Sequence, residues 1–286
     1  MKNIGFYNGT IAPLEKLTMP VLDRANYFGD GVYDALYCRG RTPFALDEHL
    51  DRFYDGLEKL EIPFRIPRAD LAEIFFALLE QLEDPTDGFD GYTLYWQVSR
   101  GTAIRSHAFP SLEVSQPNLL IMITPRTLTP RTTRLKLITL PDVRFELCHI
   151  KTLNLLPSVL ATQRALSAGC DEAVLHRDGV VTECAHSNVS ILTGGVLRTR
   201  RLDKYILPGT TRAQLLRHGS DAGLTVDETP FTLEELFAAD EVIVTSVSML
   251  CIPACEIDGK PVGGKAPELL KRLQDASWDR MMRETA

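Results

Sequence analysis

Several short segments of the chain hold residue types that suit phosphate or carbonyl chemistry. The segment LPGTTRAQLL places Gly209 directly before a predicted helix, whose first turn presents the amides and hydroxyls of Thr210 and Thr211. A helix N-terminus with such groups can bind a phosphate dianion. Ordinary helix capping by Gly and Thr is the alternative interpretation of the same residues.

Two single residues could act on a carbonyl compound. Lys151 stands alone in FELCHIKTLNLL, between a predicted strand and a predicted helix. A desolvated lysine can be a carbonyl nucleophile or a proton shuttle, although an isolated lysine usually extends its ammonium into water. Glu183 ends the β-branched run of VVTECAHSNVSIL. Its carboxylate could keep a ring nitrogen protonated, or it could be an ordinary glutamate at a strand end.

A basic loop is a candidate carboxylate site. SRGTAIRSHAFP contains Arg105 and His107, with Arg100 just upstream. An arginine can bind a carboxylate through a charge-assisted pair of hydrogen bonds. The alternative is a basic loop that water alone solvates. Taken singly, none of these segments decides a function.

The elements that position these residues fall into two predicted domains. In an N-terminal α+β domain over 1–125, helical spacing of apolar residues predicts helices, and β-branched and aromatic runs predict strands. The predicted helices cover 46–60 and 67–82, and the predicted strands cover 91–100 and 117–125. RTLTPRTT, at 126–133, has little apolar periodicity and contains a proline, so it is the expected linker.

The second predicted domain, over 134–286, alternates strands and helices around a β-rich core. Asp178–Gly179 is a hairpin signal, and Thr232 with Glu235 forms a capping-box pattern. The predicted strands cover 134–140, 171–183, 187–192, 195–200 and 241–246, and the predicted helices cover 156–169, 210–223 and the segment after Thr232.

Composition excludes several classes of protein. The 286 residues carry 31 basic and 38 acidic side chains, a net charge of −7, which argues against a general nucleic-acid binder. No apolar run is long enough to span a bilayer and no secretory signal is visible, so we expect a cytoplasmic protein without membrane contact. Six scattered cysteines and six histidines lack metal-site spacing, so no metal is expected.

Together, in their order and spacing, these segments resemble the fold-type IV (class IV) pyridoxal-phosphate aminotransferases, most closely the D-amino-acid aminotransferases. The resemblance spans nearly the whole chain. It rests on DRANYFGDGVYDAL, LDEHLDRF, QVSRGTAIRSHAFP, HIKTLNLLPSVLA, GCDEAVLHRDGVVTE, SNV, LPGTTR, VTSVS and IPACEIDGKPV. It implies a two-domain fold-type IV architecture of the α+β class, with a smaller N-terminal α+β domain, a larger C-terminal β-rich α/β domain and the cofactor between them.

The resemblance also implies roles for the cofactor pyridoxal 5′-phosphate. Lys151 matches the lysine that joins the cofactor as a Schiff base and moves the substrate proton. Glu183 matches the carboxylate beside the pyridine nitrogen, and Arg144 and Asn188 match residues that support the ring. The positions that match phosphate contacts are Arg52, Thr210, Thr211, Ser246 and Val247, with backbone amides at Thr210 and Val247 assisting.

For the substrate, the resemblance implies a carboxylate trap. It consists of Tyr33 together with Arg105 and His107, the last two donated by the partner subunit of a homodimer. The sequence departs from the family pattern at several positions. Asp34 stands where Glu is common, Val247 where a hydroxyl residue is common, and Cys184, Ala185 and His186 replace a run that is usually Gly and Ser.

The implied activity is transamination between D-amino acids, such as D-alanine, and 2-oxo acids, such as 2-oxoglutarate, in a ping-pong cycle. Alternatives within the family are a branched-chain L-aminotransferase, an (R)-amine transaminase and an aminodeoxychorismate lyase. A phosphate-ligand binding protein without catalysis is a remote alternative. Arg105 and His107 favour the D-amino-acid activity over the first three, and Lys151 with Glu183 argues against the last.

Overall fold

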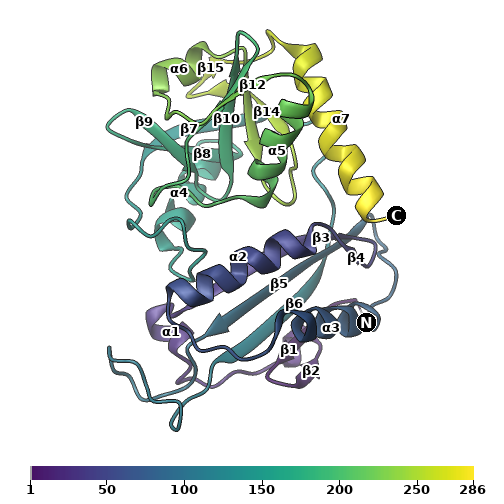
Figure 1. Ribbon diagram of the computed structural model, residues 1–286, viewed down its shortest axis with the longest axis vertical. Coiled ribbons are helices and arrows are strands. Elements are labelled where there is room, and N and C mark those ends of the chain that lie inside the picture. The colour runs from purple at the N-terminus through teal and green to yellow at the C-terminus, as the bar shows by residue number, and fades with distance from the viewer. Residues whose placement is uncertain (1) are drawn as a thin grey trace. The chain divides into compact units, whose positions relative to one another are not determined.

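The computed structural model describes residues 2–286, which form two compact units (Figure 1). The first unit holds the chain up to Leu128 together with Ile150–Asn154 and Glu284–Ala286. The second unit holds Thr129–His149 and Leu155–Arg283. The short segment around Lys151 therefore belongs to the first unit, although the chain on both sides of it belongs to the second. The domain boundaries expected from the sequence, with a linker at 126–133, stay a prediction.

The first unit is built on a six-stranded antiparallel sheet with the strand order β2-β1-β6-β5-β3-β4. Every second residue of the long central strands is buried, as alternation in a half-buried sheet requires. The strands are β1 (Ile4–Tyr7), β2 (Thr10–Ala12), β3 (Gly31–Arg39), β4 (Thr42–Pro43), β5 (Gly91–Ser99) and β6 (Asn118–Arg126). The predicted strands at 91–100 and 117–125 are confirmed.

Two helices of this unit pack on the same face of the sheet. They are α2 (Leu46–Lys59) and α3 (Arg68–Leu79), both as predicted. The buried ring of Trp96 lies 5.7 Å from the ring of Phe53 on α2 and 4.8 Å from the ring of Phe75 on α3. A single turn of 3-10 helix, η1 (Leu14–Lys16), and the short helix α1 (Arg24–Phe28) precede β3.

The second unit is built on a nine-stranded mixed sheet with the order β12-β11-β10-β13-β14-β7-β8-β9, in which β15 pairs with β14. The pairs β11–β12, β14–β7 and β7–β8 are parallel, and the others are antiparallel. The strands are β7 (Leu135–Pro141), β8 (Glu172–Arg177), β9 (Val180–Cys184), β10 (Asn188–Thr193), β11 (Val196–Thr199), β12 (Thr225–Asp227), β13 (Glu241–Thr245), β14 (Ile252–Ile257) and β15 (Lys260–Pro261).

This second sheet is curled. Strand β9 lies at one edge of the sheet, and four strands separate it from β10 in the strand order. The chain nevertheless passes from β9 to β10 through a tight turn, which is closed by a 2.9 Å hydrogen bond from the Cys184 amide to the Ser187 carbonyl. A flat sheet could not bring these two strands together in so few residues, so the sheet bends into a half-barrel. The expected fold-type IV architecture of the α+β class is confirmed.

Four helices cover the second sheet: α4 (Leu156–Ser167), α5 (Thr210–Asp221), α6 (Leu233–Ala238) and α7 (Pro267–Glu284). The capping box of Thr232 and Glu235 at the start of α6 is present as predicted. Helix α7 is not among the elements expected from the sequence, although its buried residues follow a helical spacing. They are Leu270, Leu273, Ser277 and Met281. Leu270 and Leu273 join the core cluster of Leu215 on α5.

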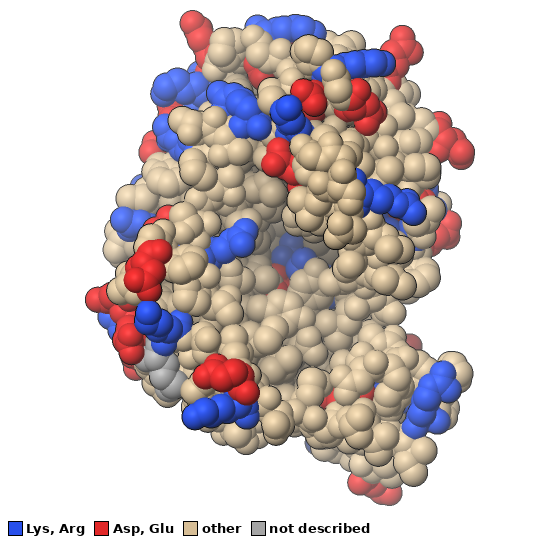
Figure 2. Space-filling view, turned by 180° about the vertical axis from the view of Figure 1, so that it is seen from behind, with Lys and Arg blue, Asp and Glu red and all other residues tan. Residues whose placement is uncertain are grey.

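The described surface carries charges of both signs, and Figure 2 shows basic and acidic side chains interspersed over one face. Within residues 2–286, no helix combines the length and the apolar composition that crossing a bilayer requires. No group of three or more His, Cys, Asp or Glu side chains in this range is arranged to hold a metal ion.

Candidate active site

Lys151 is fixed through its backbone to strand β3. The amide of Tyr33 donates to the Lys151 carbonyl at 2.9 Å, and the amide of Leu153 donates to the Gly31 carbonyl at 3.1 Å. Thr152 forms a bridge with Val32. The Lys151 Nζ lies 4.2 Å from the centre of the Tyr33 ring, which stacks on the Tyr95 ring at 5.4 Å. Lys151 and Tyr33 are therefore held together within the first unit.

The next residue of β3, Asp34, points to the other face of the sheet and lies under α2. It is fully buried, and Arg52 on α2 donates to both of its carboxylate oxygens, at 2.8 and 2.6 Å. His49 Nδ1 lies 2.9 Å from Asp34 Oδ1. Burial raises the pKa of Asp34, but Arg52 and His49 outweigh it and hold this pKa well below its ordinary value. Asp34 thus stays ionised and fixes the guanidinium of Arg52.

Burial lowers the pKa of His49, and the cations of Arg52 and Lys151 act in the same direction, against Asp34. A neutral imidazole beside an ionised carboxylate carries its hydrogen on Nδ1, so His49 donates to Asp34. The motif LDEHLDRF places His49 and Arg52 three residues apart, on one side of the helix. Arg52 is among the residues expected from the sequence and His49 is not, although this spacing indicates both.

Arg105 and His107 lie on a long exposed loop between β5 and β6, in the first unit. The Arg105 guanidinium is 5.0 Å from the centre of the Phe28 ring, and the His107 ring is 5.0 Å from the same ring. The structure therefore brings these two predicted carboxylate-binding residues together on one aromatic side chain.

In the second unit, Glu183 forms the centre of a buried polar cluster. It is 4% exposed, and Arg144 donates to its Oε1. Its Oε2 accepts from the Asn188 side-chain amide at 2.8 Å and from the Leu207 backbone amide at 3.1 Å. Burial raises the pKa of the Glu183 carboxyl to about 7, against Arg144, which lowers it. The structure thus brings together Glu183, Arg144 and Asn188, which the family resemblance places around a cofactor ring.

A second carboxylate, Asp142, holds Arg144 from behind. Arg144 donates to it from its backbone amide at 3.0 Å, from Nε at 3.0 Å and from a terminal nitrogen at 2.9 Å. The Thr182 hydroxyl, next to Glu183 on β9, also donates to Asp142, at 2.9 Å. Arg144 therefore shares its charge between two buried carboxylates. Asp142 is not among the residues expected from the sequence, although PDVRF places it two residues before Arg144.

The turn between Glu183 and Asn188 is held by another buried acid, Glu172, the first residue of β8. The Ser187 hydroxyl donates to Glu172 at 2.9 Å, and His186 Nδ1 lies 2.8 Å from the same oxygen. Half of the His186 side chain is exposed. His186, which replaces a small residue of the family pattern, thus packs on Glu172. Glu172 is not among the residues expected from the sequence, because nothing in its neighbourhood marks it as buried.

The start of α5 and the end of β13 meet at Asn188. Asn188 pairs with Thr245 across β10 and β13, and its side chain donates to the Leu207 carbonyl at 3.2 Å. Gly209, the N-cap of α5, lies so close that a Cβ there would be 1.9 Å from Asn188 Oδ1. Thr210 and Thr211 open the helix, and both are buried.

Ser246 follows β13 directly and Val247 comes next in the turn. The Ser246 carbonyl accepts from the Met249 and Leu250 amides, at 3.2 and 2.8 Å. The Ser246 and Thr245 hydroxyls are both buried, and neither has a hydrogen-bond partner within the described residues. Buried hydroxyls usually have a hydrogen-bond partner. The end of β13 therefore offers two hydroxyl groups that could donate to a ligand beside the N-terminus of α5.

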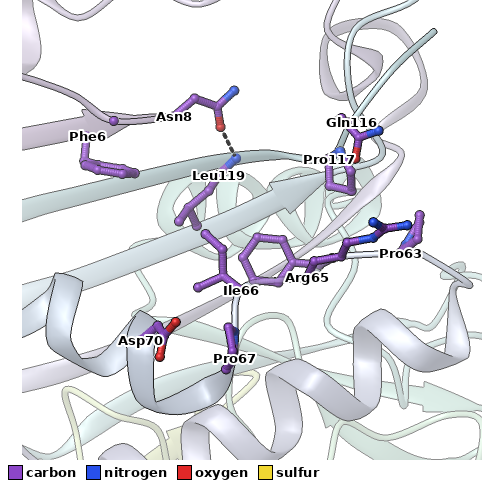
Figure 3. Close-up of a pocket in the computed structure, with 12 residues that line it drawn as sticks. Phe6, Asn8, Pro63, Arg65, Ile66, Pro67, Asp70, Gln116, Pro117 and Leu119 are labelled. Atoms are coloured by element: carbon purple, nitrogen blue, oxygen red, sulfur yellow. Dashed lines mark hydrogen bonds between the residues drawn. The ribbon is translucent and has the colours of Figure 1, made fainter. Parts of the chain in front are cut away.

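A groove elsewhere in the first unit is separate from these residues (Figure 3). It has a volume of about 430 Å³ and is lined by β1, the 63–67 loop, the start of α3 and the start of β6. Apolar side chains such as Ile66 and Leu119 face it, and the Asn8 side chain accepts from the Leu119 amide at its rim, at 2.8 Å. None of the site residues expected from the sequence lines this groove.

Comparison with known proteins gives a consistent result. Residues 31–257 match the family model described as amino-transferase class IV. The chain is 34% identical over 281 residues to the D-alanine aminotransferase of Bacillus licheniformis, with 98% of each chain covered.

Two solved structures share the fold. One is the branched-chain amino acid aminotransferase of Escherichia coli, with a TM-score of 0.86, 21% identity and coverage of 100% of this chain and 97% of that one. The other is the T.th. branched-chain amino acid aminotransferase with pyridoxamine 5′-phosphate, with a TM-score of 0.79, 24% identity and coverage of 98% and 96%. From the match of its sequence to the family model over most of its length, this chain belongs to the class IV aminotransferases.

Proposed function

We propose that this chain uses pyridoxal 5′-phosphate to move amino groups between D-amino acids and 2-oxo acids, in two half-reactions that share one site. The observation that best supports pyridoxal 5′-phosphate as the cofactor is the buried cluster of Glu183, Arg144 and Asn188. The preference for D-amino acids is supported by the 34% identity to a D-alanine aminotransferase and by Arg105 and His107. The branched-chain enzymes are similar at 21% and 24% identity, which bears on the fold alone.

The residues present fit this cofactor. Its phosphate is a dianion that needs several donors, and the buried hydroxyls of Thr245 and Ser246 are unpaired beside the first turn of α5. Because Gly209 has no side chain, the backbone at the start of α5 can lie close to Asn188. On this proposal Thr210, Thr211, Ser246 and Val247 hold the phosphate, together with Arg52, whose orientation Asp34 fixes.

Glu183 suits the opposite end of the cofactor. A carboxyl with a pKa of about 7 matches a pyridine nitrogen, because the two groups then bind a shared proton with similar strength. Arg144 already divides its charge between Glu183 and Asp142, so a further cation beside Glu183 is favourable. Glu183 would therefore hold the proton on the ring nitrogen, with Asn188 and Arg144 fixing the carboxylate.

When bound, pyridoxal phosphate supplies an electrophilic carbonyl for the amino group and a ring that accepts the electron pair released at Cα. Lys151 would attach to it covalently. Once displaced by the substrate, the Lys151 amine would act as a base that takes the proton from the substrate Cα and delivers it to the former carbonyl carbon of the cofactor. The hydrogen bonds that fix the Lys151 backbone to β3 limit where its Nζ can reach.

The substrate carboxylate would be bound by Tyr33, Arg105 and His107, the last two from the partner subunit of a homodimer. The exposed loop that carries them supports this proposal, since Ile104 is 83% exposed, Val114 69% and Phe109 57%. Apolar side chains gathered on one exposed loop favour contact with another protein surface. A cytoplasmic location stays part of the proposal.

The experiment that tests this function is a panel of D- and L-amino acids with 2-oxoglutarate as acceptor. The proposal predicts product from D-amino acids. Product from branched-chain L-amino acids, from (R)-amines without a carboxylate, or from aminodeoxychorismate would favour the corresponding family alternative. A protein that binds pyridoxal phosphate and turns over none of these compounds would be the non-catalytic alternative.

A further inference from the structure

The loop that carries Arg105 and His107 is fastened to α1 at its base. The Arg24 amide donates to the Gly101 carbonyl at 2.9 Å, and the Tyr27 hydroxyl donates to the Ala103 carbonyl at 2.5 Å. Asp23, the N-cap of α1, bridges to Thr102 and accepts from the Asn118 side chain at 2.7 Å. The two ends of the loop are therefore fixed against the same short helix.

A buried charge cluster reaches from α1 into the tip of the loop. Arg24 is 3% exposed and donates to Asp30 at 2.7 Å, to the Ser106 carbonyl at 2.7 Å and to the Ala108 carbonyl at 3.4 Å. These two carbonyls flank His107. Arg100 shares Asp30, at 3.0 Å, and its guanidinium lies 3.5 Å from the centre of the Phe109 ring. Arg24 thus fixes the backbone on both sides of His107.

The charges of this cluster are matched. Two buried arginines, Arg24 and Arg100, share the Asp30 carboxylate, and the buried Asp23 carboxylate precedes Arg24 in the chain. The loop backbone is therefore held by hydrogen bonds from a charged guanidinium, which are stronger than hydrogen bonds between neutral groups.

Phe28, the last residue of α1, supports the side chains themselves. The guanidinium of Arg24 lies 4.8 Å and that of Arg105 5.0 Å from the centre of its ring, and the His107 ring is 5.0 Å away. A guanidinium and an aromatic ring are both attracted to such a ring, the first by a cation–π interaction and the second by an aromatic–aromatic contact. Exposed arginine and histidine side chains otherwise sample many rotamers, and binding a ligand would then cost the entropy of ordering them.

We propose that Phe28 and Arg24 are positioning residues that hold Arg105 and His107 in a carboxylate-binding arrangement before the substrate arrives. Phe28 orders the two side chains, and Arg24 orders the backbone that carries them. This inference rests on the proposed function, in which Arg105 and His107 bind the substrate carboxylate. It assigns roles to α1 and to the buried cluster that lie outside the cofactor chemistry of Lys151 and Glu183.

The test is the variant Phe28→Leu, which removes the ring and keeps apolar bulk. We expect the KM for D-alanine and for 2-oxoglutarate to rise about tenfold. The inhibition constant of propanoate, a carboxylate without an amino group, should rise by a similar factor. The change in kcat should stay under about twofold, and the affinity for pyridoxal phosphate should not change. Phe28→Tyr keeps the aromatic face and should restore wild-type values. Phe76→Leu, at a 46% exposed phenylalanine of α3, is the matched control and should behave as wild type.

A second variant, Arg24→Lys, keeps the charge and removes the planar group that bonds both carbonyls. It should raise the same KM values and the propanoate inhibition constant by about tenfold or more. If either variant lowers only thermal stability or cofactor affinity, with unchanged KM and propanoate inhibition, the positioning role is wrong. Equal effects on kcat and on KM in both variants would also contradict it. A wild-type protein without activity on D-amino acids would instead overturn the proposed function, and this inference with it.

Discussion

At the residue scale, two buried carboxylates next to arginines differ in a way that matters for function. Asp34 accepts hydrogen bonds from Nε and one terminal nitrogen of Arg52 and from His49, so its pKa lies well below the ordinary value. Burial raises the pKa of Glu183 to about 7, because Arg144 is shared with Asp142 and does not fully compensate for it. One carboxylate is thus a permanent anchor, and the other exchanges a proton near neutral pH.

The raised pKa of Glu183 predicts how the stability of the cofactor-free protein depends on pH. Its pKa is raised from 4.5 to about 7, so its contribution to stability is fully present below pH 4.5 and is lost as the pH rises through 7. This loss is about 3 kcal/mol over that window. The Tm of the wild type relative to that of Glu183→Gln should therefore fall between pH 5 and 8. A relative Tm that stays flat or rises over this range would show that Glu183 is ionised throughout.

Lys151 carries a second residue-scale prediction. Lys151→Ala should still bind pyridoxal phosphate, because the phosphate and ring contacts come from other residues. It should lose the covalent attachment that borohydride makes permanent, and it should lose turnover, since nucleophile and base vanish together. Mass spectrometry after borohydride treatment checks the attachment. Lys59→Ala, at an exposed lysine paired with Asp55, is the control and should keep both properties. Near wild-type turnover in Lys151→Ala would contradict the assignment.

At the scale of elements, the start of α5 depends on one missing side chain. Gly209 has an ordinary backbone φ of −65°, so an alanine there is not strained by its conformation. Its Cβ would, however, lie 1.9 Å from Asn188 Oδ1, so either Asn188 or the helix start must move. Gly209→Ala should therefore weaken pyridoxal phosphate binding by about tenfold or more, through loss of about 1.4 kcal/mol or more of positioned contacts.

Gly56→Ala is the matched control for this experiment. Its Cβ would lie 3.4 Å from the nearest side-chain atom, an ordinary contact, within the helix α2. It should leave cofactor affinity unchanged and stabilise the protein by up to about 1 kcal/mol. Equilibrium titration of the cofactor-free proteins, followed by absorbance, compares the two variants. Equal affinities for Gly209→Ala and Gly56→Ala would remove α5 from the phosphate site.

Elements with a strong local signal could be predicted from the sequence. Helix α2, the capping box of α6 and the central strands β5 and β6 came from periodicity and capping residues alone. The pairing of Lys151 with β3 could not, because a backbone bridge such as Thr152 to Val32 joins distant residues and leaves no periodic pattern. Asp142 and Glu172 were missed for a related reason: their burial results from how the strands of the curled sheet assemble.

At the scale of the whole molecule, the proposal requires that two chains build each site. Arg105→Ala should raise the KM for D-amino acids and 2-oxo acids and leave cofactor affinity intact. The loss in kcat/KM should be on the order of 2–4 kcal/mol, since a charge-assisted contact is removed.

Mixing the Arg105→Ala protein with the Lys151→Ala protein then tests whether the site is shared. A heterodimer would contain one site with both residues intact, so activity should return after subunit exchange. Mixing each variant with itself is the control and should give no recovery. Absence of recovery after exchange has been verified by mass spectrometry of differently tagged chains would contradict a site shared between subunits.

The most direct test of the central claim compares the two enantiomers of alanine with the wild-type enzyme. Purified protein loaded with pyridoxal phosphate is given D-alanine or L-alanine, each with 2-oxoglutarate, and pyruvate is measured over time. The account predicts pyruvate from D-alanine and a rate at least about a hundredfold lower from L-alanine, the discrimination that about 2.7 kcal/mol of carboxylate positioning provides. Equal rates, or a preference for L-alanine, would contradict it.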